Sequence, residues 1–159
     1  MSVSDVSEAV ASPVAVIGAG SFGTALAIQL ARRGSRTRLW GRNAVEMVEA
    51  DRTRHNPRYL TDCEFPMLLA ATGDVDAALR DAEDIVIATP SHALRATVEM
   101  LKPKLQAGRG VVIACKGFEP GSGKLSHEVV AEVLDVSHPY AVYRGRHSPT
   151  NSGVDCRRR

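Results

Sequence analysis

Three glycines near the start of the chain have the spacing of a turn that cradles phosphate. Gly18, Gly20 and Gly23 form a G-x-G-x-x-G pattern between the apolar residues 15–17 and a run with helical periodicity. In this setting the first glycine permits a tight turn, the second lets the backbone approach a pyrophosphate, and the third lets the helix pack close to its strand. The N–H groups of the first helical turn favour negative charge. The segment therefore predicts a dinucleotide site.

An arginine follows the next apolar run. Arg42 comes just after residues 37–40, near the place where an NAD-specific fingerprint has an acid, about 20 residues past the first glycine. Residues 38–43 contain no acid, and the planar donors of an arginine suit a 2′-phosphate. Arg42 therefore favours NADP(H) without excluding NAD(H). A solvated turn arginine is the alternative.

A lysine and a histidine follow two further runs. Lys116 comes directly after the apolar residues 110–115, so its ammonium is expected at the rim of a cleft near a nicotinamide, where it would bind a substrate oxygen or phosphate. A merely solvated lysine is the alternative. His92 would polarise a carbonyl, although a histidine in the first turn of a helix is more often a surface residue. The other histidines and the three cysteines lack ligand spacing, so no metal site is expected.

The order of the predicted elements brings these residues together. Apolar runs alternate with helical patterns, which is typical of an α/β fold with a doubly wound, Rossmann-like parallel sheet of strand order 3-2-1-4-5. In such a sheet ligands bind beyond the carboxyl ends of the strands, so the glycine turn, Arg42 and Lys116 are expected at one edge. Ser91 is expected to cap the helix after the fourth strand, and a last helix to span residues 125–134. The predicted strands are residues 15–17, 37–40, 67–71, 84–89 and 110–115.

Composition bounds the domain organisation and the function classes. The chain has 159 residues, 44% hydrophobic and 24% charged, which suits one globular core. A net charge of +2 with few aromatic residues gives no case for nucleic acid. No apolar run has the length of a membrane span, and the widely spaced cysteines fit a reducing cytoplasm. We expect a flexible arm at residues 1–12, a dinucleotide-binding domain at 13–142 and a disordered basic tail at 143–159.

With these residues in view, the chain resembles the bacterial NAD(P)-dependent glycerol-3-phosphate dehydrogenases. The similarity extends over residues 14 to about 142. The glycine pattern is common to many dehydrogenases, whereas Cys115-Lys-Gly-Phe-Glu-Pro120 beside Pro90-Ser-His-Ala-Leu-Arg95 is specific to this family. The matching segments are residues 17–27, 39–43, 56–60, 90–95 and 114–125.

The resemblance implies a reaction and a set of binding residues. Members of the family interconvert dihydroxyacetone phosphate and sn-glycerol 3-phosphate by hydride transfer to or from a nicotinamide, for glycerophospholipid synthesis. Ser21 and Phe22 would contact the cofactor phosphates, and Arg42 the adenosine end. Tyr59 matches a position that lines the cofactor cleft in some members. Lys116 matches the lysine that touches both the cofactor and the substrate, whose phosphate is anionic.

The sequence departs from the family pattern after residue 142. There the family continues with Leu-Ser-Gly-Pro and a helical domain that holds the proton-transferring lysine. Residues 143–159 read differently, and a reading-frame shift near Tyr143 is our hypothesis, which the nucleotide sequence of the gene tests. We therefore expect no catalytic base in this chain and no turnover by it alone. Apolar surface that such a domain would cover predicts a homodimer or aggregation.

Two alternatives to the family's dehydrogenase activity stay open. One is an NAD(P)-binding module without turnover. The other is a different dehydrogenase of similar fold, such as a hydroxyacid or sugar-phosphate enzyme, which substrate screening would reveal.

Overall fold

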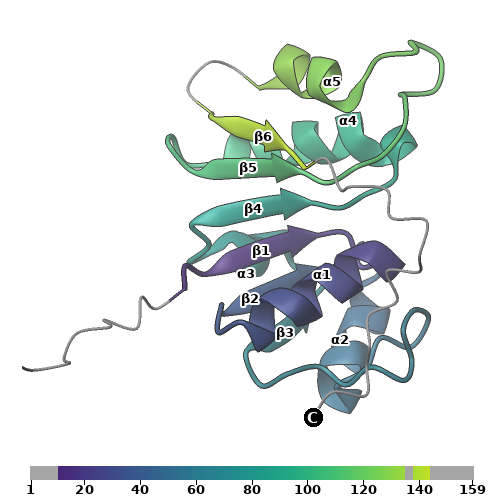
Figure 1. The fold of residues 1–159 in the computed structure, drawn as a ribbon, viewed down its shortest axis with the longest axis vertical. Helices are drawn as coiled ribbons and strands as arrows, with labels where there is room; N and C mark the ends of the chain where they lie inside the picture. Colours follow the sequence, from purple (N-terminus) through teal and green to yellow (C-terminus); the bar gives the residue numbers. More distant parts are fainter. Residues whose placement is uncertain (1–10, 135–137, 144–159) are drawn as a thin grey trace, which may run out of the picture.

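All six strands run parallel in one sheet, with helices on both of its faces (Figure 1). The structure is a computed structural model that describes residues 11–134 and 138–143. The strand order is β3-β2-β1-β4-β5-β6. The strands are β1 (Val14–Ile17), β2 (Thr37–Trp40), β3 (Leu69–Thr72), β4 (Asp84–Ile87), β5 (Gly110–Ile113) and β6 (Tyr140–Val142).

The helices form two layers that bury the two faces of the sheet separately. Side chains of α1 and α2 pack against one face, and those of α3, α4 and α5 against the other. Strand β1 serves both cores, because Val14 and Val16 point to the first and Ala15 and Ile17 to the second. The helices are α1 (Ser21–Arg32), α2 (Ala44–Thr53), α3 (Val75–Leu79), α4 (Ser91–Leu101), the short 3₁₀ helix η1 (Lys102–Lys104) and α5 (Ser126–Val133).

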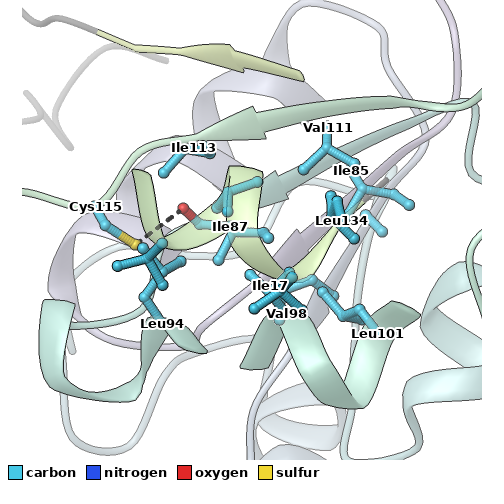
Figure 2. Close-up of a cluster of buried hydrophobic side chains, with 14 of the residues drawn as sticks. Ile17, Ile85, Ile87, Leu94, Val98, Leu101, Val111, Ile113, Cys115 and Leu134 are labelled. Atoms are coloured by element: carbon cyan, nitrogen blue, oxygen red, sulfur yellow. Dashed lines mark hydrogen bonds between the residues drawn. The ribbon is translucent and has the colours of Figure 1, made fainter. Parts of the chain in front are cut away.

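The core under α4 explains why this helix stays against the sheet (Figure 2). Leu94, Val98 and Leu101 recur at helical spacing and are almost completely buried against Ile87 and Ile113. Each such side chain contributes about 1.5–3 kcal/mol of hydrophobic free energy. The burial fixes the start of α4, which forms one wall of the site described below.

The starts of α2 and α4 are capped differently. The Asn43 side chain accepts a hydrogen bond from the Glu46 N–H at the start of α2. The Ser91 cap is wrong, since Ser91 is the first residue of α4 and Pro90 occupies the cap position without a side-chain hydrogen bond. Proline is acceptable there because the N–H that it lacks has no partner in a first turn.

The predicted order of the first five strands is confirmed, and the sequence analysis missed β6. This strand has only three residues, all exposed, so it lacks the apolar pattern of a buried strand. The fourth and fifth strands end earlier than predicted, at Ile87 and Ile113. The third begins later than predicted, because Met67 is 98% exposed outside the sheet.

Parts of the predicted arm and tail lie outside the described residues. These parts are residues 1–10 and 144–159, and residues 135–137 are likewise not described. Near the two ends of the described part of the chain, Ser12 donates a hydrogen bond to Glu83, and the Tyr143 N–H donates one to the Ile113 carbonyl. Within the described ranges, no helix combines the length and apolar character required to cross a membrane. The domain boundaries stay predictions.

Candidate functional site

A cavity of about 760 Å³ opens at the carboxyl ends of β1, β2, β4 and β5. Among its lining residues are seven of the predicted site residues, which are Gly18, Gly20, Ser21, Phe22, Arg42, Tyr59 and Lys116. His92 lines it as well. The size suits an extended small ligand, and the position is where open parallel sheets bind theirs.

Each of the three glycines lacks a Cβ for a different structural reason. A Cβ on Gly18, whose φ is +122°, would lie 2.8 Å from the Ala88 carbonyl oxygen. A Cβ on Gly23 would lie 1.8 Å from the Gly18 oxygen, so this glycine lets α1 pack on the turn. A Cβ on Gly20 would meet no described atom within 4 Å and would project into free space beside the cavity. Of these three glycines, only Gly20 leaves room for a ligand.

The first turn of α1 offers backbone donors to that space. Gly20 is the cap residue, and its carbonyl accepts the first helical hydrogen bond, from Thr24. In the described part of the chain no side chain caps this turn, and the turn contains no acidic residue. The N–H groups of Ser21 and Phe22 thus stand at the cavity wall with the positive end of the helix dipole, which suits a phosphate.

Lys116 reaches the same wall from β5. Its Nζ lies 5.8 Å from the centroid of the Phe22 ring, over the ring face. The next residue, Gly117, has a φ of +95°, and a Cβ there would lie 3.6 Å from the Ser91 hydroxyl. The backbone therefore turns sharply after Lys116 and leaves its ammonium at the end of the cavity nearest β4 and β5.

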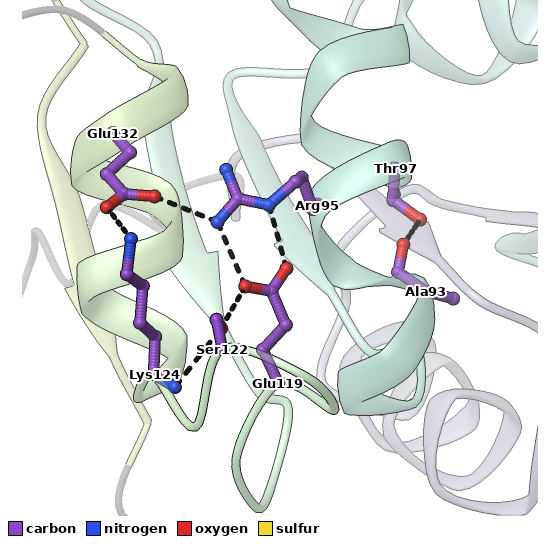
Figure 3. Close-up of polar contacts among 7 residues, drawn as sticks. All are labelled: Ala93, Arg95, Thr97, Glu119, Ser122, Lys124 and Glu132. Atoms are coloured by element: carbon purple, nitrogen blue, oxygen red, sulfur yellow. Dashed lines mark hydrogen bonds and ion pairs between the residues drawn. The ribbon is translucent and has the colours of Figure 1, made fainter.

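A charged network anchors the loop that follows Lys116 (Figure 3). Arg95 of α4 donates two hydrogen bonds to Glu119, at 2.8 and 2.9 Å, and a third to Glu132 of α5 at 2.8 Å. Lys124 also pairs with Glu132. The bonds from Arg95, followed by one from Ser122, lower the pKa of Glu119 to about 2, and Glu119 in turn raises the pKa of Arg95.

Asn56 is a positioning residue that the sequence analysis missed. Its side chain is 2% exposed and donates to the Ala19 carbonyl at 3.0 Å and to the Thr24 hydroxyl at 2.9 Å. Its Oδ1 accepts the N–H groups of Arg58 and Tyr59. One buried amide thus ties the glycine turn to the loop with Tyr59. In the sequence, only its place in the matching segment 56–60 drew attention to Asn56.

The end of the cavity near β2 is polar and of mixed charge. Arg42 is exposed there, and among the described residues none forms a hydrogen bond or an ion pair with its guanidinium. The search for an acid over residues 38–43 missed Glu46, which lines the same cavity from the first turn of α2 and pairs with Arg58 at 3.4 Å. Helix α2 returns the carboxylate to the cavity although it lies several residues beyond the strand.

Cys115 lines the cavity beside Lys116 without being reactive. Its thiol contacts the Thr89 hydroxyl at 3.7 Å and is 7% exposed. Burial raises the pKa of the Cys115 thiol, and the contact with Thr89 offsets this only in part. The thiol is therefore protonated at neutral pH and acts as a small apolar wall.

The cavity has two ends with polar side chains and the glycine turn between them. Arg42 and Tyr59 lie at one end, and Lys116 at the other. The uncapped helix N-terminus lies between them, with the space beside Gly20. This arrangement could hold a dinucleotide, whose diphosphate would lie in the middle and whose two nucleosides would lie at the ends.

Comparisons with known proteins agree with this reading. Residues 13–147 match the model of the NAD-dependent glycerol-3-phosphate dehydrogenase N-terminus. A glycerol-3-phosphate dehydrogenase [NAD(P)+] of Stenotrophomonas maltophilia is 54% identical over 136 residues, which are 85% of this chain and 40% of that protein. One of Xanthomonas euvesicatoria is 50% identical over 83% of this chain and 39% of its own length.

A solved structure of the same family is similar to this chain as well. The crystal structure of a glycerol-3-phosphate dehydrogenase from Coxiella burnetii aligns with a TM-score of 0.76 at 40% identity, over 82% of this chain and 40% of that one. The chain thus spans about 40% of the length of the relatives that it matches.

Proposed function

Because this chain belongs to the family of NAD-dependent glycerol-3-phosphate dehydrogenase N-terminal domains, we propose that it binds the nicotinamide dinucleotide used by such an enzyme. The observation that supports this most is that the glycine turn and Lys116, which are almost a hundred residues apart, line one cavity. The dinucleotide would supply hydride chemistry at its nicotinamide.

Each part of the cavity would bind a different part of the cofactor. The N–H groups at Ser21 and Phe22 hold the diphosphate, and Arg42 with Tyr59 holds the adenosine end. Lys116 holds the nicotinamide end and an anionic substrate together, because its ammonium has three donors and stands at the rim. The substrate would be glycerol 3-phosphate, which the relatives' names contain, or its oxidised form, dihydroxyacetone phosphate.

Arg42 favours NADP(H), with NAD(H) also accepted, since an arginine fork suits a 2′-phosphate. We place the protein in the cytoplasm. We also propose self-association through exposed apolar side chains, among them Phe118 (63% exposed) and Tyr143 (55% exposed). Light scattering that gives a monomer at all concentrations would contradict that part.

Titration of the purified chain with NADPH and NADH, followed by the fluorescence of Trp40, tests the proposal. Trp40 lines the cavity, so saturable binding should change its emission. Gly20→Val should weaken binding at least about tenfold with unchanged thermal stability, since the added side chain has room in the protein but occupies the space of the diphosphate. Gln29→Ala, an exposed change on the same helix, is the control.

The outcome that contradicts the proposal is equally specific. Absence of binding at millimolar cofactor, or binding that Gly20→Val leaves unchanged, would exclude a dinucleotide at this cavity. Dihydroxyacetone phosphate should give no steady NADPH oxidation with this chain, because we propose that the proton-transferring base belongs to the part of such enzymes that these residues do not match.

A further inference from the structure

The carboxylate of Glu46 and the guanidinium of Arg58 meet at the cavity end that holds the proposed adenosine ribose. The Arg58 Nη1 lies 3.4 Å from the Glu46 Oε1, and both residues line the cavity together with Arg42. Their side chains come from separate segments, the first turn of α2 and the loop after it. The two opposite charges therefore form part of the binding surface.

Each partner is held at its backbone while its charged end can move. The Glu46 N–H donates to the Asn43 side chain, and the Arg58 N–H donates to Asn56. The Arg58 guanidinium also lies 5.7 Å from the centroid of the Tyr59 ring. The side chain of Arg58 is 61% exposed, so its guanidinium can leave Glu46 without unfolding anything.

The two charges favour different cofactors. A carboxylate accepts hydrogen bonds from the two ribose hydroxyls of NAD(H), and it repels the 2′-phosphate of NADP(H). A guanidinium binds that phosphate with parallel hydrogen bonds. In the pair, Arg58 neutralises Glu46, so the end of the cavity presents neither a strong acid nor a second free cation beside Arg42.

We propose that the Glu46–Arg58 ion pair sets the relative affinity of this site for NADH and NADPH. With NADH, Arg58 stays on Glu46 and the carboxylate meets the ribose. With NADPH, Arg58 leaves Glu46 and joins Arg42 at the 2′-phosphate, so part of the affinity for the phosphate offsets the broken pair. This inference rests on the proposed function and explains how one site would accept both cofactors.

Charge-neutral variants test the pair in the full 159-residue chain. Glu46→Gln removes the repulsion and frees Arg58, so the ratio of NADPH to NADH affinity should rise about tenfold. Arg58→Gln leaves Glu46 unpaired, so the ratio should fall about tenfold. Glu49→Gln and Arg52→Gln are matched controls, because that pair lies on the same helix at 2.7 Å and does not line the cavity.

Binding constants from calorimetry are the readout. Adenosine 2′,5′-bisphosphate against adenosine 5′-monophosphate measures the same end of the cavity without the nicotinamide, and it should give the same two opposite shifts. The proposed role of the Glu46–Arg58 pair would be overturned if the ratio of NADPH to NADH affinity changed less than about twofold in both variants, or changed as much in the controls. Either result would leave the proposed function intact. A wild-type chain that binds neither cofactor would instead overturn the proposed function.

Discussion

The ammonium of Lys116 lies over the aromatic ring of Phe22, 5.8 Å from the ring centroid. One residue follows β5 and the other begins α1 after β1, and β4 lies between these strands. The contact brings a positive charge to the glycine turn from a segment far along the chain. It marks the end of the cavity where we propose that the nicotinamide and the substrate meet.

Lys116→Met should weaken NADPH binding about three- to tenfold, because it removes the cation at this end and keeps most of the side-chain volume. The thermal midpoint should change little, since Lys116 is exposed. Lys102→Met removes an exposed lysine outside the cavity lining and is the control. Equal effects of the two variants would show that only net charge matters.

Gly23→Ala should destabilise the fold rather than the complex. Its Cβ would lie 1.8 Å from the Gly18 oxygen, so α1 has to move away from the turn. Overpacking of this kind costs about 1–3 kcal/mol or more in the free energy of unfolding, which urea denaturation measures. A variant as stable as the wild type would mean that α1 and the turn are not packed as described.

Asn56→Ala should both destabilise the chain and weaken cofactor binding. The change removes the hydrogen bonds to Ala19 and Thr24 and to the loop of Tyr59, at a cost of about 1–3 kcal/mol. Thr61→Ala, an exposed change in the same loop, should do neither. Denaturation together with NADPH titration measures both effects. Loss of stability with unchanged affinity would contradict a positioning role for Asn56.

The Arg95–Glu119 pair predicts that the folded chain loses stability at acid pH. Because the pKa of Glu119 in the folded chain is about 2, against an ordinary value of 4.5, its stabilising contribution is present above that ordinary value. It is lost as the pH falls from about 4.5 towards 2. The pKa of Glu132 is lowered too, mainly by its hydrogen bond with Lys124, so Glu132 also stabilises the fold less as the pH falls.

Unfolding free energies between pH 5 and pH 2 check this. Glu119→Gln should flatten the pH dependence in that range, whereas Glu99→Gln, an exposed glutamate on α4, should leave it unchanged. Identical pH curves for Glu119→Gln and the wild type would show that the network does not hold the loop after Lys116 in solution.

The sequence was sufficient to predict the first five strands and their order, because their signals are local. The buried β-branched runs and the glycine turn fix strands β1, β4 and β5, and the alternation of elements fixes their order. The same local reasoning placed Arg42 and Lys116 at one edge. It missed β6, whose three exposed residues depend on pairing with β5 rather than on their own pattern.

The remaining parts of the site depend on contacts between distant segments. The hydrogen bonds of Asn56 to Ala19 and Thr24 span more than thirty residues, and no periodicity indicates them. Glu46 was missed because the acid was sought next to β2, whereas the first turn of α2 brings it back to the cavity. Such pairings become visible only when the elements are packed.

Amide chemical shifts during a titration with NADPH test the central claim most directly. If the first turn of α1 cradles the diphosphate, the largest changes should occur at the amides of Gly20, Ser21 and Phe22. Smaller changes should occur at Arg42 and Lys116, at the two ends of the cavity. Changes confined to the opposite edge of the sheet, near Met67 and Leu68, or none at saturating cofactor, would contradict the account.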